Sequence, residues 1–222
     1  MTTESAPDAA PRRAERRRGR GLLISGVLCL VLGFGGLGWS AWDLFWNPLV
    51  DPGVAAAQAS GLREEWAAPA EAARPLPGDA VALLRIPAFG ADFEQPVLAG
   101  TDQRTLKKGL GWYAGTAAPG EVGNFSVAGH RGATGPFSRM HELKAGDEVV
   151  VETREAVHTY RLTNDPAETT VMDTDTWVIQ PVPGRPEVKP TEALITLTTC
   201  NDLFRSPRRM IAFGVLADTR SK

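Results

Sequence analysis

Cysteine and histidine are both scarce in this chain of 222 residues, which has two cysteines and three histidines. Cys29 and Cys200 lie far apart, and His130, His141 and His158 show no ligand-like spacing. A structural zinc site needs four closely placed ligands. The sequence therefore predicts no metal site.

Charge of one sign is also lacking, because the formal net charge is only -2. A chain this close to neutral has no overall attraction to a polyanion, so we expect no nucleic-acid partner. A hydrophobic run near the C-terminus is missing as well, since the chain ends "ADTRSK". Any membrane anchor must then lie near the N-terminus.

The longest stretch without charge runs from Gly21 to Trp42. As a helix it would span roughly 33 Å, the thickness of a bilayer's hydrocarbon core. Trp39, Trp42 and Trp46 gather at its far end, where amphipathic rings favour the membrane interface. The arginine-rich stretch 12–20 precedes it, so the positive-inside rule places the N-terminus in the cytoplasm.

A cleaved signal peptide is the alternative for this stretch. Its apolar part is too long for one, and the nearest small-x-small site, Ala57-Gln58-Ala59, lies well past its end. A lipoprotein signal is also disfavoured, because the bulky Leu28 precedes Cys29. We therefore predict an uncleaved signal anchor in the cell membrane, a single pass over residues 21–46, with the following residues outside the cell.

That topology bears on Cys200, in the string "TLTTC". Cys29 lies in the membrane segment, so the two cysteines cannot pair within one chain. An unpaired cysteine is unusual in an exported domain, because such compartments favour disulfides. Cys200 is then either a small buried residue at the end of a strand or a nucleophile.

Short β-branched segments dominate the chain from Leu76 onward, and Gly, Pro or Asp bound most of them. We predict eight strands, at 80–87, 94–100, 123–130, 147–153, 158–163, 168–173, 193–200 and 209–216. Short helices are expected at 102–113 and 137–143. Many short strands with little helix indicate an all-β barrel or sandwich.

The predicted organisation has five parts. Residues 1–20 form a basic, disordered cytoplasmic tail and 21–46 the transmembrane anchor. Residues 47–75 form an extracellular juxtamembrane linker, within which 54–68 has helical propensity and 68–79 is rich in proline. The β domain covers 76–218, and 219–222 is a tail.

A cysteine nucleophile needs a proton donor for the leaving group and a group that stabilises the developing oxyanion. His130 sits where a strand ends and a turn-rich loop begins, a place typical of active sites. His141, in a short polar helix, and His158, on the outer face of a strand, fit structural or solvent-exposed roles better. Arg209 begins the strand after Cys200, so a short connection would bring the two to the same end of a sheet.

Together, His130 after "SVAG", the string "TLTTC" some 70 residues later and Arg209 nine residues beyond it resemble the sortases. These are cysteine transpeptidases of Gram-positive cell surfaces, with the motif T-L-x-T-C. The resemblance covers about Leu76 to Ala217. It implies a closed eight-stranded sortase-type β-barrel with short helices, which needs no cofactor.

By this resemblance, Cys200 is the nucleophile, His130 the general acid and base, and Arg209 the stabiliser of the oxyanion or substrate. The implied substrate-binding residues are Thr199, Leu197, Trp177 and Ile179, the last two in a long loop over the substrate groove. Implied partners are secreted proteins with a C-terminal sorting signal, cut between Thr and Gly, and an amine of a peptidoglycan precursor.

The single N-terminal anchor and the stretch 171–184 most resemble class E sortases of actinobacteria, which prefer Leu-Ala-x-Thr-Gly signals. Two departures bear on the substrate: "GATGPF" lacks the usual tyrosine after the histidine, and Asn201-Asp202 replaces the frequent His-Pro. A class C enzyme is less consistent with the sequence, which has neither a C-terminal membrane segment nor an obvious N-terminal lid motif. An L,D-transpeptidase would need its His and Cys much closer, and a catalytically altered binding module on the same barrel stays the alternative.

Overall fold

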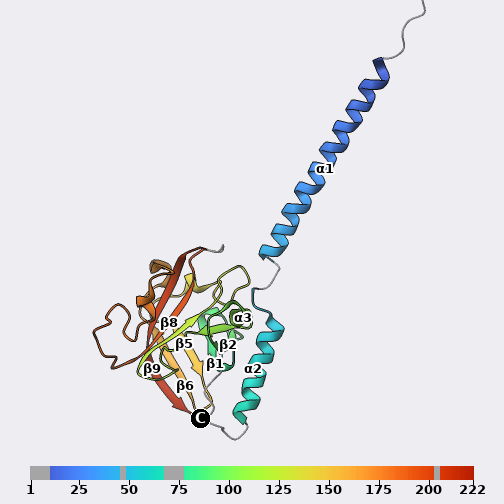
Figure 1. Cartoon of the computed structure of the whole chain (residues 1–222). Coiled ribbons are helices and arrows are strands. Elements are labelled where there is room, and N and C mark those ends of the chain that lie inside the picture. Colours follow the sequence, from blue (N-terminus) through green and yellow to red (C-terminus); the bar gives the residue numbers. More distant parts are fainter. Residues whose placement is uncertain (1–10, 46–48, 68–77, 203–205) are drawn as a thin grey trace, which may run out of the picture. The chain divides into compact units, whose positions relative to one another are not determined.

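The computed structural model describes residues 11–45, 49–67, 78–202 and 206–222. By contacts, the chain divides into two compact units, Met1–Trp46 and Asn47–Lys222. Among the described residues, nine strands and the helix α2 belong to the second unit, which carries every candidate site residue. Figure 1 shows α2 beside β1 and β2 of this unit.

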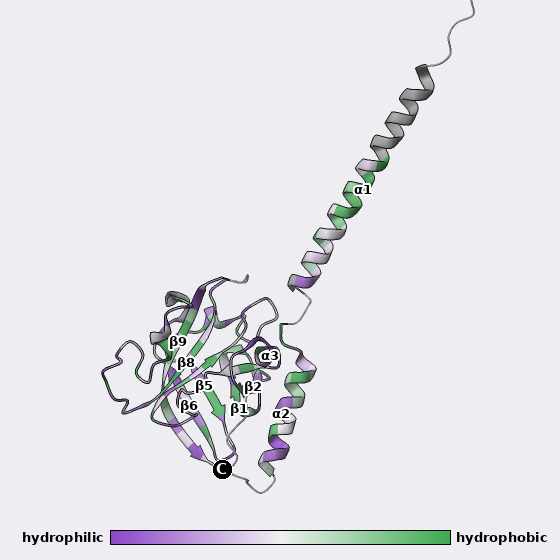
Figure 2. Ribbon diagram, in the orientation of Figure 1, coloured by the Kyte–Doolittle hydropathy of each residue, from purple (hydrophilic) through white to green (hydrophobic). Residues whose placement is uncertain are grey.

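The first unit is one helix, α1, Pro11–Phe45. Its segment Ile24–Asp43 is long and apolar enough to cross a membrane, and it fits the predicted anchor (Figure 2). The helix starts earlier than expected: the arginine-rich stretch 12–20, predicted to be disordered, is helical. Arg and Ala are strong helix formers and Pro is favoured at a first helical position, which explains the difference. Residues 1–10 and 46 of the predicted parts lie outside the described residues.

Helix α2, Pro52–Ala67, confirms the helical propensity of the juxtamembrane segment. Asp51 caps it, because its Oδ1 accepts hydrogen bonds from the backbone N–H groups of Gly53 and Val54. Ala59 and Leu62 pack against Leu83 of the barrel. The segment predicted as a linker thus contributes a docked helix to the second unit, while its proline-rich part at 68–77 lies outside the described residues.

The strands of the second unit form one sheet, closed on itself. They are β1 Ala80–Arg85, β2 Glu94–Ala99, β3 Leu110–Trp112, β4 Gly123–Ala128, β5 Glu148–Glu152, β6 Ala156–Leu162, β7 Thr170–Met172, β8 Ala193–Cys200 and β9 Arg208–Ser221. The order is β6-β5-β1-β2-β3-β4-β8-β9, and β9 pairs back to β6, so eight strands close the barrel. Short β7 pairs with the start of β9 on the edge that β6 occupies further along.

Helices between the strands are short, as predicted. They are α3 Gln103–Leu106 and four 3₁₀ turns, η1 Pro87–Phe89, η2 Met140–Glu142, η3 Pro166–Glu168 and η4 Thr176–Ile179. The helix expected over 137–143 is reduced to η2.

The eight-stranded closed barrel is confirmed, but two strands differ from the prediction. β3 lies where a helix was expected, and β7 was counted although it stands outside the ring. β3 contains Gly111, where a Cβ atom would collide with the carbonyl oxygen of Gly100. Only glycine permits that backbone approach, and such a strand carries no alternating apolar pattern. β9 also runs to Ser221, so most of the predicted tail 219–222 belongs to a strand.

The barrel interior holds one hydrophobic core, to which β4 contributes Phe125 and Val127 and β8 contributes Ile195 and Leu197. Side chains alternate along a strand, so Thr196, Thr198 and Cys200 occupy the opposite face of β8. Both faces of β8 are buried from Ile195 to Thr199, and Cys200 at its end is only partly buried.

Candidate active site at the end of strand β8

The sheet register brings the three candidate catalytic residues to one end of the barrel. β4 runs parallel to β8 with Ala128 opposite Thr198, so His130 and Cys200 each lie two residues beyond a paired position. β9 runs antiparallel to β8 and places Arg209 directly opposite Cys200. The predicted proximity of Cys200 and Arg209 in neighbouring strands is confirmed.

A cleft of about 400 Å³ opens at this end, and Cys200, His130 and Arg209 all line it. Cys200 is a free cysteine of intermediate exposure, as a nucleophile at a cleft must be. The other lining residues are Leu49, Thr101, Gln103, Leu106, Tyr113, Ala128, Gly129, Arg131, Gly132, Thr198, Thr199 and Asp202.

The loop that carries His130 is tied to the cysteine strand by two hydrogen bonds. The Gly129 N–H donates to the Thr198 carbonyl at 3.0 Å, and the Thr199 hydroxyl donates to the Gly129 carbonyl at 2.8 Å. Thr199 is 2% exposed, so its bond is shielded from water. The cleft thus holds His130 in place through the residue that precedes Cys200.

Burial lowers the pKa of His130 below its usual 6.5, and the nearby charge of Lys107 lowers it further. The imidazole is therefore neutral at neutral pH. A neutral imidazole can accept a proton from a thiol, which is what a general base beside a cysteine must do.

Arg209 is engaged on one side of its guanidinium. Its Nη1 donates to the backbone carbonyls of Ser206 and Arg208, and its Nη2 lies 3.5 Å from the Asp173 carboxylate. A guanidinium has five N–H donors in a planar fork. Three contacts leave donors for a substrate, and they hold the group at the rim of the cleft.

Of the four predicted substrate-binding residues, only Thr199 lines this cleft. Leu197 was wrongly assigned, because it is fully buried in the barrel core. The motif T-L-x-T-C gives no sign of which alternate positions face inward. In this structure Leu197 fills the core, whereas Thr198 and Thr199 line the cleft.

Trp177 and Ile179 do not line the cleft either. Trp177 packs on Phe213, with ring centroids 6.0 Å apart, and lines a separate hollow of about 380 Å³ over β8 and β9. Buried hydrogen bonds hold the loop there, since the Asn124 amide donates to the carbonyls of Val178 and Gln180. The loop expected to cover the substrate groove is instead fixed to the outer face of these strands.

Tyr113 is a cleft residue that the sequence reasoning missed. Its hydroxyl lies 3.2 Å from the Thr198 hydroxyl, within hydrogen-bond distance. It follows β3, the strand mistaken for a helix, so no predicted element pointed it toward the site.

The remaining histidines lie away from the cleft. His141 is exposed in η2, as expected. His158 was expected on an outer face but is 8% exposed and shares the buried face of β6 with Tyr160. Its Nδ1 lies 3.1 Å from the Thr219 hydroxyl. Across the described ranges, no three His, Cys, Asp or Glu side chains cluster in a way that could hold a metal ion.

A closed β-barrel with a cysteine, a histidine and an arginine at the ends of three adjoining strands defines a class: cysteine enzymes with their site on the rim of a barrel. Comparison with known proteins identifies the group within that class. A family profile described as "Sortase domain" matches residues 84–217.

The chain is 32% identical to sortase SrtE1 of Streptomyces coelicolor, over 99% of this chain and 66% of that relative, so it spans about two-thirds of the relative's length. The structure of sortase E from Streptomyces avermitilis matches at 38% identity and a TM-score of 0.59, covering 66% of this chain and 93% of that one. Sortase E1 from Streptomyces coelicolor, solved with a tripeptide in the active site, matches at 33% identity and a TM-score of 0.57, covering 67% and 94%. The chain belongs to the sortase family, and its barrel is that of a sortase transpeptidase.

Proposed function

We propose that this protein is a membrane-anchored, class E-like sortase. It cleaves a C-terminal sorting signal of the Leu-Ala-x-Thr-Gly or Leu-Pro-x-Thr-Gly type between Thr and Gly, and joins the new carboxyl end to an amine of a peptidoglycan precursor. The observation that carries this proposal is the shared cleft of Cys200, His130 and Arg209 at the end of a sortase barrel. Relatives named sortase E support the class.

In the first step, the Cys200 sulfur attacks the carbonyl carbon of the signal's threonine, and His130 takes the thiol proton. The C–S bond forms, the C–N bond to glycine breaks, and His130 returns the proton to the leaving amine. Arg209, opposite Cys200 in the register, supplies N–H donors to the oxyanion. Thr199 helps to position His130, because its hydroxyl donates a hydrogen bond to the loop that carries this histidine.

In the second step, an amine attacks the thioester. The new C–N bond forms while the C–S bond breaks, and sulfur leaves as the thiolate. An acceptor that arrives as an ammonium ion loses two protons in all. One reaches the sulfur through His130, and the other goes to solvent.

The apolar helix supports a single-pass anchor, and the arginines before it favour a cytoplasmic N-terminus with the barrel outside the cell. That arrangement suits substrates presented at the outer membrane surface. It places the enzyme where secreted proteins and wall precursors meet.

The test uses the full-length chain in detergent with quenched fluorescent peptides carrying either signal, with and without an added amine. Mass spectrometry should find the amine joined to the threonine end of the peptide. His130→Gln should lose activity by about 10³-fold, within the range for a general acid or base, whereas the matched change His141→Gln should not. Binding of either peptide by a folded protein without cleavage would instead favour the binding-module alternative.

A further inference from the structure

Asp202, two residues beyond Cys200, is an exposed carboxylate on the wall of the same cleft. Among the described residues that line the cleft it is the only acidic side chain, whereas Arg131 and Arg209 are cationic. Nothing in the first step calls for it: the nucleophile, the proton carrier and the oxyanion donor are other residues.

The carboxylate of Asp202 is weakly engaged. Its Oδ1 accepts one long hydrogen bond, 3.4 Å from the side-chain nitrogen of Asn201. Arg209, which lies opposite Cys200 in the register, is paired instead with Asp173 and with backbone carbonyls. Within the part of the chain that the structure describes, Asp202 forms no ion pair, so its charge is open to a ligand.

The other charged side chains at the cleft are positive and would repel a cationic ligand. Arg131 and Arg209 line the cleft, and the charge of Lys107 is felt at His130, where it disfavours the imidazolium. An aliphatic amine is protonated at neutral pH. Without a carboxylate, the approach of such an acceptor to the thioester would be repelled from several sides.

We propose that Asp202 is the residue that receives the acceptor's ammonium group and sets the preference of the second step for cationic amines over water. This inference rests on the proposed function. Asp202 holds the ammonium at the mouth of the cleft, beside the thioester. After deprotonation, the amine attacks the carbonyl carbon with the bond and proton changes given above.

The experiment measures how the thioester partitions between water and an added nucleophile, in the full-length chain at pH 7. The two nucleophiles are glycylglycine amide, mostly an ammonium ion at this pH, and hydroxylamine, mostly uncharged. The variants are Asp202→Asn, Asp202→Glu and the matched control Glu155→Gln. Glu155 is an exposed carboxylate in the β5–β6 turn, beside the chain's C-terminal residue and away from the cleft.

For Asp202→Asn we expect the ratio of aminolysis to hydrolysis with glycylglycine amide to fall roughly fivefold, the effect of one charge pair near water. The ratio with hydroxylamine should not change. Asp202→Glu should restore the first ratio, Glu155→Gln should leave both as in the wild type, and added salt should shrink the difference.

Equal changes with both nucleophiles, or none with either, would overturn the role of Asp202. The proposed function stands in that case if the wild-type chain still joins the peptide to an added nucleophile. Absence of any peptide cleavage by the wild-type chain would overturn the proposed function itself, and this inference with it.

Discussion

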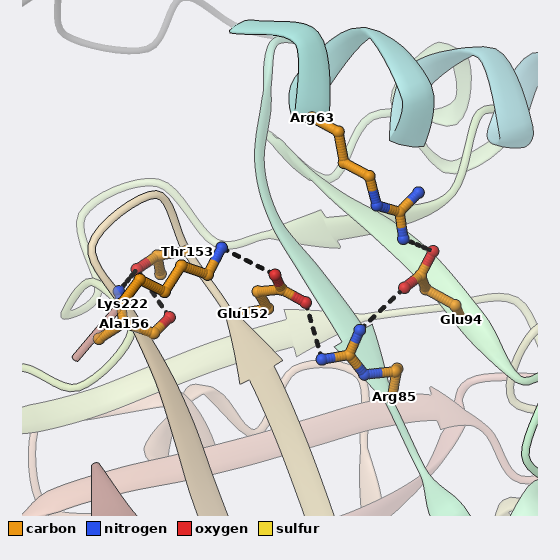
Figure 3. A network of polar contacts seen from close by, with 7 residues as sticks. All are labelled: Arg63, Arg85, Glu94, Glu152, Thr153, Ala156 and Lys222. Carbon is orange, nitrogen blue, oxygen red and sulfur yellow. Dashed lines mark hydrogen bonds and ion pairs between the residues drawn. The ribbon is translucent and has the colours of Figure 1, made fainter. Parts of the chain in front are cut away.

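Two regions of the barrel differ in how fully their polar side chains are engaged. At the cleft, Cys200, His130 and Asp202 lie in or beside loops, with few partners and partial exposure. On the side covered by α2, charged side chains of three strands, the helix and the C-terminus form a continuous chain of ion pairs (Figure 3). We call this second region the α2 clamp, made of Arg63, Glu94, Arg85, Glu152 and Lys222.

The α2 clamp alternates in sign from end to end. Arg63 of α2 contacts Glu94, Glu94 contacts Arg85, Arg85 contacts Glu152, and Glu152 contacts Lys222. Beneath it, Ala59 and Leu62 pack on Leu83, and the Lys222 ammonium lies 4.2 Å from the ring centroid of Trp66. The cleft residues can therefore make few stabilising contacts of their own, because the contacts that stabilise the barrel lie in other regions.

The substitution with the largest expected effect should remove activity at the cleft without a matching loss of stability. Cys200→Ala should abolish transpeptidation, by at least about 10³-fold, and change the free energy of unfolding by less than about 1 kcal/mol. A partly exposed thiol at the end of a strand contributes little packing. Parallel activity assays and denaturant melts test this, and a loss of several kcal/mol would mean that Cys200 serves the core.

Leu62→Ala tests the packing of α2 on the barrel. Leu62 is 4% exposed against Leu83, so its truncation should cost about 2–4 kcal/mol. The turnover number of the protein that remains folded should stay within about twofold of wild type, because no cleft residue is touched. A large fall in turnover with unchanged stability would show that α2 acts on the site directly.

Glu152→Gln should have a smaller, pH-dependent effect. Burial alone would raise the pKa of Glu152, but hydrogen bonds from Lys222 and Arg85 outweigh it and hold the pKa below its usual 4.5. A depressed pKa contributes stability that is present above 4.5 and lost as pH falls through the folded value.

The free energy of unfolding of the wild type should therefore exceed that of the Glu152→Gln variant by about 1 kcal/mol or less at pH 7, since the ion pairs are partly exposed. Melts from pH 7 to pH 3 should show that advantage disappear on the acid side. A difference in stability that persists at pH 3 would contradict the view that Glu152 stabilises the protein through its charge.

The smallest effect is electrostatic and lies at the cleft. Lys107→Met removes a positive charge that disfavours the His130 imidazolium, so the pKa of His130 should rise. It should stay below 6.5, because burial is the larger cause. An NMR titration of the histidine ring protons measures it, with His158 as a reference that should not move.

The sequence predicted that Cys200 and Arg209 lie at the same end of neighbouring strands, because that signal is local. Cys200 and Arg209 are joined by a short connection, and neighbouring strands with a short connection place their joined ends together. The parallel pairing of β4 with β8, which brings in His130, has no local signal and was not predicted.

The errors arose where distant contacts decide the outcome. Whether Leu197 faces the core depends on the register of β8 with β4, and Trp177 is placed by its contact with Phe213. β3 was missed because Gly111 is set by a backbone approach from Gly100, and the docking of α2 depends on Leu83. None of these partners is adjacent in sequence to the residue that it positions.

The central claim is that Cys200 forms the covalent intermediate. The most direct measurement incubates the full-length chain with a sorting-signal peptide in the absence of amine, digests it, and maps the added mass by mass spectrometry. We predict a thioester on Cys200 alone, absent from Cys29, discharged by added amine and absent from Cys200→Ala. Cleavage that continues in Cys200→Ala, or an acyl group found on another residue, would contradict the account.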